Sequence, residues 1–335
     1  MKEYLPEGEL YCRPDNKFYI SHRKGLEESM SANRTLEAPC IVCDRAHNLI
    51  VDFGFIKGII PRNEGAVGIE EGVTRDIALI SRVNKPVCFK VQGLTRDSFG
   101  NESVILSRRA AQEECLRDYV KTLTPGDIIP VKVTHMEQFG AFVDMGCGLP
   151  SLIPIDLISV SRISHPADRF YIGQMIKTVV KSIDESSGFP KPGMTRKFTL
   201  SQKELLGTWE ENVERYSVGE TVAGVVRSIE SYGIFVELTP NLAGLAELRE
   251  SGTSHQPIYV GQQTSVYIKA IIPEKMKIKL IIVDTFDETD DRISGFLSRK
   301  NEYFIGGKHL DRWTYSCAGA DKVIESVFNP RRNDI

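Results

Sequence analysis

The sequence predicts a mainly β protein in which small closed barrels follow one another along the chain, joined by short helices. Landmarks recur along the 335 residues, which indicates a repeat. Within each repeat the apolar segments are short, rich in Val, Ile, Thr and Phe, and bounded by Gly, Pro or Asp, as strands are. Between the repeats, the segments 109–123 and 202–216 are rich in Glu, Leu, Ala and Arg, and we expect them to be connecting helices.

The repeat is clearest in two glycine-containing segments. Phe139-Gly-Ala-Phe142-Val-Asp144 recurs as Tyr232-Gly-Ile-Phe235-Val-Glu237, and the neighbouring landmarks recur with the same offset. A fainter third copy precedes them, in which residues 49–54 match residues 141–146. Three units of similar length are therefore expected.

Several short strands in a unit too small for a two-sheet sandwich predict a five-stranded Greek-key barrel, the OB-fold. In the central unit the expected strands are 128–134, 141–145, 175–182 and 197–201. The expected organisation is an N-terminal segment with a helix at 22–32 capped by Ser21, three barrel modules, and an aromatic and basic tail. Their ranges are 1–35, 36–108, 124–203, 217–283 and 286–335.

Composition restricts the class of protein. The formal net charge of −3 argues against coating nucleic acid by charge alone. No apolar run approaches the ~18 residues that a membrane helix needs, and the first residues do not resemble a signal peptide, so we expect a cytoplasmic protein with no membrane partner. The seven cysteines fit reduced thiols. Cys40 and Cys43 fall three apart in an expected strand, so they would point to opposite faces and are predicted to be core thiols.

Catalytic and cofactor signatures are absent from the sequence. It contains no phosphate-binding loop, dinucleotide fingerprint, nucleophile elbow or zinc-protease motif, and its six histidines are dispersed. His135 lies in an expected strand and is predicted to be a wall or core residue. We therefore expect no enzyme, no cofactor and no metal site.

The two aromatic pairs are the strongest functional signal. Residues three apart in a flat strand face opposite sides, but a glycine between Phe139 and Phe142, or between Tyr232 and Phe235, permits a bulge that turns both rings onto one surface. Such a platform stacks nucleobases, at about 1–3 kcal/mol per base. The alternative is that one ring of each pair belongs to the core; the recurrence of the pair favours the platform.

The order of these features resembles the S1 RNA-binding domain. In 124–203 it includes FGAFVD, R-x-S-H-P, G-Q-x-x-K and T-L-S-x-K. Residues 217–283 match well and 36–108 only in outline, and the arrangement is similar to bacterial ribosomal protein S1 in a short, three-module form. The resemblance implies that the chain binds single-stranded RNA, in particular mRNA, during translation. A free RNA chaperone or regulator, and a protein-interaction scaffold, are the alternatives.

The resemblance also assigns RNA contacts position by position. The family often has a histidine on the third strand, whereas this chain has Pro154 and Glu247 there, and Pro273 replaces the aspartate of the last module. The residues that match the family's contacts are Phe139, Phe142, Arg162, His165, Asp184, Arg196, Lys197, Tyr232, Phe235, Lys275, Lys277 and Lys279.

The first module differs at the platform positions, which hold His47 and Ile50. This resembles the ribosome-proximal modules of ribosomal protein S1, so residues 1–108 are expected to dock on the small ribosomal subunit while 124–283 bind RNA. Charges nearly balance in the two RNA-binding modules, which predicts a shallow salt dependence. In the tail, Trp313 and its aromatic neighbours could form a second RNA site, but packing against the last barrel is favoured.

Overall fold

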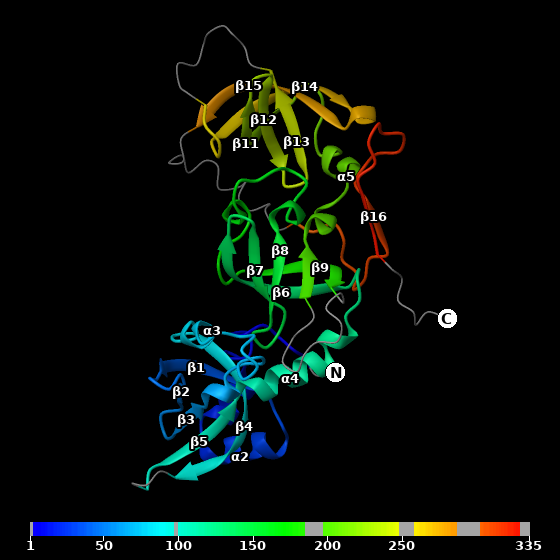
Figure 1. Ribbon diagram of the computed structural model, residues 1–335. Helices are drawn as coiled ribbons and strands as arrows, with labels where there is room; N and C mark the ends of the chain where they lie inside the picture. Colours follow the sequence, from blue (N-terminus) through cyan, green and yellow to red (C-terminus); the bar gives the residue numbers. More distant parts are fainter. Residues whose placement is uncertain (1–2, 97–99, 185–196, 248–257, 287–301, 329–335) are drawn as a thin grey trace, which may run out of the picture. The chain divides into compact units, whose positions relative to one another are not determined.

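The computed structural model describes residues 3–96, 100–184, 197–247, 258–286 and 302–328, and its main elements are three closed five-stranded barrels (Figure 1). The predicted fold class, tandem OB-type barrels, is therefore confirmed. The chain forms two compact units. One comprises residues 1–123, 143–151 and 183–198, and the other comprises residues 124–142, 152–182 and 199–335.

All three barrels share one strand order. The first strand pairs with the second and the fourth, and the third strand closes the barrel by pairing with the fifth. Where the register is resolved, this closing pair is parallel, and the other pairs are antiparallel. The strands are β1 (Leu36–Cys43), β2 (Leu49–Asp52), β3 (Lys57–Ile60), β4 (Pro86–Arg96) and β5 (Glu102–Ser107); β6 (Ile128–Glu137), β7 (Gly140–Asp144), β8 (Pro150–Pro154), β9 (Met175–Asp184) and β10 (Lys197–Ser201); β11 (Thr221–Glu230), β12 (Gly233–Thr239), β13 (Leu242–Ala246), β14 (Gln263–Ile272) and β15 (Lys277–Phe286).

The N-terminal segment contains two helices, α1 (Pro14–Ile20) and α2 (Arg23–Ser31), rather than one. The sequence suggested that Ser21 caps α2, but the residue at the N-cap position is His22. Ser21 follows α1, and its hydroxyl donates to the Phe18 carbonyl at 2.8 Å. Leu26 of α2 packs into the core of the first barrel, which also contains the short helix α3 (Ile77–Ile80) through Leu79.

The two expected connecting helices differ in continuity. The first is α4 (Arg108–Asp118), capped by Ser107, whose hydroxyl accepts from the Ala110 amide at 2.8 Å. The second is broken. A 3-10 turn over Lys203–Leu206 ends at Gly207, which has a φ of 86°, and α5 (Trp209–Val213) then begins with Thr208 as its cap. A residue in the left-handed region ends a helix, so the apolar pattern alone overestimated its length.

The C-terminal tail packs in the second compact unit. It contains a two-stranded sheet of β16 (Arg312–Thr314) and β17 (Glu325–Val327) (Figure 1). Trp313 and Tyr315 are buried in one cluster with Trp209 of α5 and the core side chains of the third barrel. Packing against the last barrel is therefore confirmed for Trp313 and Tyr315, whereas Tyr303 packs beside Val179 of the central barrel.

The cysteines are unpaired thiols. Cys40 is fully buried, and burial raises the pKa of its thiol; Cys43 is half-buried on the same strand, and burial raises its pKa too. Within the described residues, no three His, Cys, Asp or Glu side chains gather closely enough to ligate a metal ion. In the same residues, no helix has the length and apolar character needed to cross a bilayer.

Three carboxylates are buried in the first compact unit. Arg108 and Arg82 pair with Glu7, so its pKa falls to about 2 although burial acts to raise it. Burial, followed by the charge of Glu7, raises the pKa of Asp144 to about 7 and that of Glu37 to about 7. One oxygen of Glu37 accepts the amides of residues 8, 10 and 11, while its other oxygen has no hydrogen-bond partner in the described structure.

This burial predicts a pH-dependent stability. Because folding raises the pKa of Glu37 from 4.5 to about 7, protonated Glu37 stabilises the fold below about pH 4.5, and this contribution is lost as pH rises through 7. Glu37→Gln should make the free energy of unfolding less dependent on pH, by about 1–3 kcal/mol between pH 5 and 8. Calorimetric unfolding across that range measures it, with the exposed Glu71→Gln as the control. Equal slopes in wild type and Glu37→Gln would contradict the prediction.

Candidate nucleic-acid interface

The central barrel presents its two aromatic rings on the outer surface. Phe139 lies in the turn before β7 with 58% of its surface exposed, and Phe142 is half-buried on β7. The neighbouring strand residues Ala141 and Val143 are fully buried in the barrel. The two ring centroids are 5.9 Å apart with an interplanar angle of 87°, so the rings are in edge-to-face contact.

The third barrel repeats this arrangement. Tyr232 lies in the turn before β12 and is 64% exposed, while Phe235 is half-buried on the strand. Their centroids are 6.1 Å apart with an interplanar angle of 90°. Ile234 and Val236, on either side of Phe235, are buried in the core. In both barrels the first ring is exposed in a turn, and the second is half-buried and not among the buried core residues.

In the third barrel, both rings reach one face without a bulge at the glycine. Next to Gly233 the pairing of β12 with β13 is regular, and the shift in β11 falls between Val226 and Ser228. Both rings share a face because the first stands in the turn. The glycines are needed for close approach instead. A Cβ on Gly140 would lie 2.5 Å from the Ile153 carbonyl oxygen, and one on Gly233 would lie 2.7 Å from that of Ala246.

His135 adds a third ring to the central platform, and the sequence analysis missed it. Its ring stacks near Phe142, with centroids 6.0 Å apart and 25° between the planes, and it hydrogen-bonds Glu137 at 2.6 Å. Its side chain is 58% exposed. Strand alternation would place His135 on the inner face after Val131 and Val133, but the buried positions of β6 end at Val133, and the His135 ring lies beside that of Phe142 on the outer surface.

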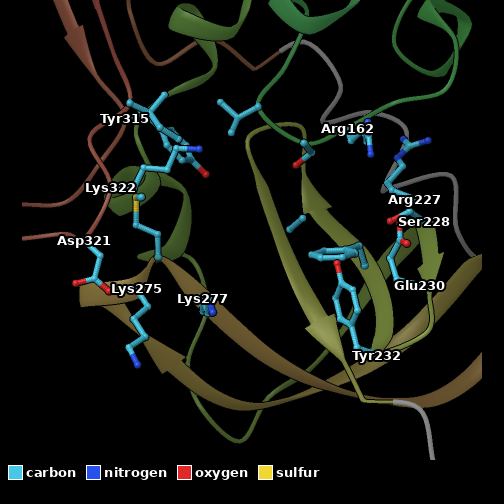
Figure 2. Close-up of a pocket in the computed structure, with 16 residues that line it drawn as sticks. Arg162, Arg227, Ser228, Glu230, Tyr232, Lys275, Lys277, Tyr315, Asp321 and Lys322 are labelled. Atoms are coloured by element: carbon cyan, nitrogen blue, oxygen red, sulfur yellow. The ribbon is translucent and has the colours of Figure 1, made fainter.

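A groove of about 620 Å³ lies beside the platform of the third barrel (Figure 2). It gathers five of the residues predicted to bind RNA: Arg162, Tyr232, Phe235, Lys275 and Lys277. Arg162 was expected at the rim of its own module, but the structure places it in the groove of the next one. Residues 315, 321, 322 and 324 of the tail also line the groove, and of these only Tyr315 belongs to the aromatic and basic pattern seen in the sequence.

Only some of the basic groups in the groove are free to meet a ligand. Arg227 is held by Glu237 at 2.7 Å and by Asp168 at 3.2 Å. Burial acts to raise the pKa of Asp168, but the charge of Arg227 and backbone hydrogen bonds lower it below its usual value. By contrast, Arg162 and the groove lysines are exposed, and none has a carboxylate within 4.0 Å in the described part of the chain.

The other predicted contacts lie outside this groove. His165 caps a 3-10 turn, where its Nδ1 accepts from the Ala167 amide at 3.1 Å. Asp184 ends β9, Lys197 begins β10, and Lys279 lies on β15, all with exposed side chains. Arg196 lies outside the described residues.

In the first barrel the two positions that match the platform rings hold His47 and Ile50 instead. His47 lies in a turn with a φ of 62°, its Nδ1 3.7 Å from a carboxylate oxygen of Asp76, and Ile50 is half-buried on β2. A depression of about 690 Å³ here is lined by Ile50, Ile59 and the exposed Phe55. Polar residues, Asp52, Lys57 and Glu102 among them, also line this depression, and the ring of Phe55 lies 6.3 Å from that of Phe53.

Comparisons with known proteins agree with this geometry. Residues 122–188 match the model of the S1 RNA binding domain. The small ribosomal subunit protein bS1 of Staphylococcus aureus (strain COL) is 30% identical over 309 residues, which cover 87% of this chain and 74% of that protein. The bS1 protein of Staphylococcus saprophyticus is 28% identical over 339 residues, covering 97% and 81%.

Among solved structures, a multidomain protein with nucleic acid binding domains from Streptococcus pneumoniae TIGR4 is 13% identical, with coverage of 79% and 78% and a TM-score of 0.22. The family assignment rests on the sequence relatives, since the match to the Staphylococcus aureus protein extends over three quarters of its length. The chain belongs to the family of small ribosomal subunit protein bS1.

Proposed function

We propose that this protein binds unpaired mRNA in translation and presents it to the small ribosomal subunit. The observation that carries the proposal is the pair of mutually perpendicular rings, one exposed and one half-buried, that recurs on the central and third barrels. Every nucleobase has an apolar face that can lie on such a ring, but only an unpaired strand can splay its bases onto the platform. Stacking tolerates all bases, so sequence preference is mild.

The first module has the complementary role in this proposal. Its platform positions hold His47 and Ile50 in place of the aromatic pair, and Ile59 and the exposed Phe55 line a depression together with Ile50. Residues 1–108 dock on the small ribosomal subunit, while the central and third modules hold RNA. The proposal involves no chemical step, and its place is the cytoplasm, where ribosomes work.

Two other functions fit the same surfaces. A free RNA chaperone or regulator would use the platforms without stable attachment to the ribosome, and a scaffold would bind proteins instead of RNA. Co-sedimentation with small subunits at low and high salt distinguishes ribosome attachment from free RNA binding. Absence of binding to an unstructured RNA at micromolar protein would leave the scaffold.

The first prediction concerns the central platform. Phe139→Ala combined with Phe142→Ala should weaken binding to an unstructured oligoribonucleotide at least ten-fold, because two stacking surfaces worth about 1–3 kcal/mol each are removed. Fluorescence anisotropy measures the affinity. Tyr171→Ala is the matched control, since Tyr171 is an equally exposed aromatic, at 67%, outside the platform. Equal losses in the control and the double variant would refute the platform.

The second prediction concerns the third ring. His135→Ala should lower RNA affinity about three- to ten-fold, and His135→Tyr should retain it, because a tyrosine ring can occupy the same stacked position against Phe142. The same titration measures both variants. Ser228 occupies the corresponding position of the third module, so Ser228→Ala should change affinity much less. An unchanged affinity in His135→Ala would show that this ring supports Phe142 without contacting RNA.

The third prediction separates docking from RNA binding. His47→Ala combined with Ile50→Ala should leave affinity for free RNA within about two-fold, because neither residue belongs to a ring pair, and should reduce co-sedimentation with small subunits. Circular dichroism checks that the barrel remains folded, because Ile50 is half-buried. A large loss of RNA affinity in this variant would refute the division of roles.

A further inference from the structure

The C-terminal tail forms one side of the groove beside Tyr232 and Phe235. Tyr315, Asp321, Lys322 and Ile324 line the groove together with the platform. In the view of Figure 2, Tyr315, Lys322 and Lys275 stand on one side, and Tyr232 stands on the other. The platform of the third barrel is therefore one wall of a cleft, whereas the sequence repeat alone predicts an open surface.

This tail wall, residues 315–324, is fixed in place by hydrogen bonds. Tyr315 is buried; its carbonyl accepts the Trp209 amide at 3.0 Å, and its hydroxyl donates to the Asn241 carbonyl at 2.5 Å. Further along, the Asp321 amide donates to the Glu274 carbonyl at 3.1 Å.

The two ends of the tail wall are also joined to each other. The amide of Tyr315 donates to the Ile324 carbonyl at 2.9 Å, and the hydroxyl of Ser316 donates to the Lys322 carbonyl at 2.7 Å. A wall ordered before binding loses little conformational entropy when a ligand arrives.

The charges of the groove are arranged for a polyanion. Its lining includes five basic residues and two acidic ones, in a chain whose net charge is −3. Lys322 on the tail wall and Lys275 and Lys277 after β14 are exposed, and none is within 4.0 Å of a carboxylate in the described residues. An ammonium group without a carboxylate partner meets a phosphate without first breaking an ion pair.

We propose that the tail wall is the phosphate-binding side of the third module. Lys322, with Lys275, contacts the backbone of a single strand whose bases stack on Tyr232 and Phe235. The inference rests on the proposed function and adds to it a backbone contact that the repeat does not encode. It also predicts that the RNA affinity of the third module depends on salt, although the overall charge of that module is balanced.

The test isolates the third module within the full chain by using the Phe139→Ala/Phe142→Ala background. In anisotropy titrations with an unstructured oligoribonucleotide, Lys322→Ala should weaken binding about five-fold at low salt. It should also make the plot of log affinity against log salt shallower by about 0.7, the contribution of one phosphate contact. Lys322→Arg should retain both values.

The matched control is Lys308→Ala, because Lys308 is an exposed lysine of the same tail outside the groove, and it should change neither quantity. If Lys322→Ala and Lys308→Ala behave alike while Tyr232→Ala/Phe235→Ala reduces binding, the tail wall does not contact RNA and the proposed function stands. If Tyr232→Ala/Phe235→Ala also leaves binding unchanged, the proposed function of the third module itself fails.

Discussion

In the central barrel and in the third barrel, close backbone contact at one glycine positions the aromatic rings on which the proposed function depends. At Gly140 and Gly233 the next strand passes so near that no side chain fits, and each glycine directly follows the turn that carries the first ring. The strand then places the second ring on the outer face and its neighbours in the core. Base stacking therefore depends on the same packing that holds the barrel together.

A second constraint joins the central module to the third. Arg169 and Arg227 share the buried carboxylate of Glu237, at 2.5 and 2.7 Å, and Asp168 balances the second arginine. Removing one member of such a cluster leaves an uncompensated buried charge, at a cost of roughly 3–5 kcal/mol. The segment between β8 and β9 carries Asp168 and Arg169 of this cluster and also Arg162, so the cluster explains how a side chain of one module comes to line the groove of the next.

The sequence predicted the barrels well because their signals are local. Alternating apolar residues located β10 at 197–201 without error, and the recurrence of the ring pair identified the platform. Features set by tertiary contacts could not be read in this way. His135 does not continue the inward alternation of β6 but lies beside Phe142, and the apolar pattern after residue 202 does not show the break at Gly207. The tail residues of the groove have no counterpart in the repeat.

The order in which the chain is synthesised matters for one contact of the tail. The start of β6 exchanges hydrogen bonds with residues far ahead in the sequence: the Ile128 amide donates to the Lys308 carbonyl, the Leu310 amide donates to the Gly126 carbonyl, and His309 pairs with Asp127. A nascent chain therefore leaves this edge of the central barrel uncovered until the third module has already been made. During that interval the exposed edge is open to pairing with other polypeptides, so the speed of elongation through the last third of the message bears on the yield of correctly folded protein.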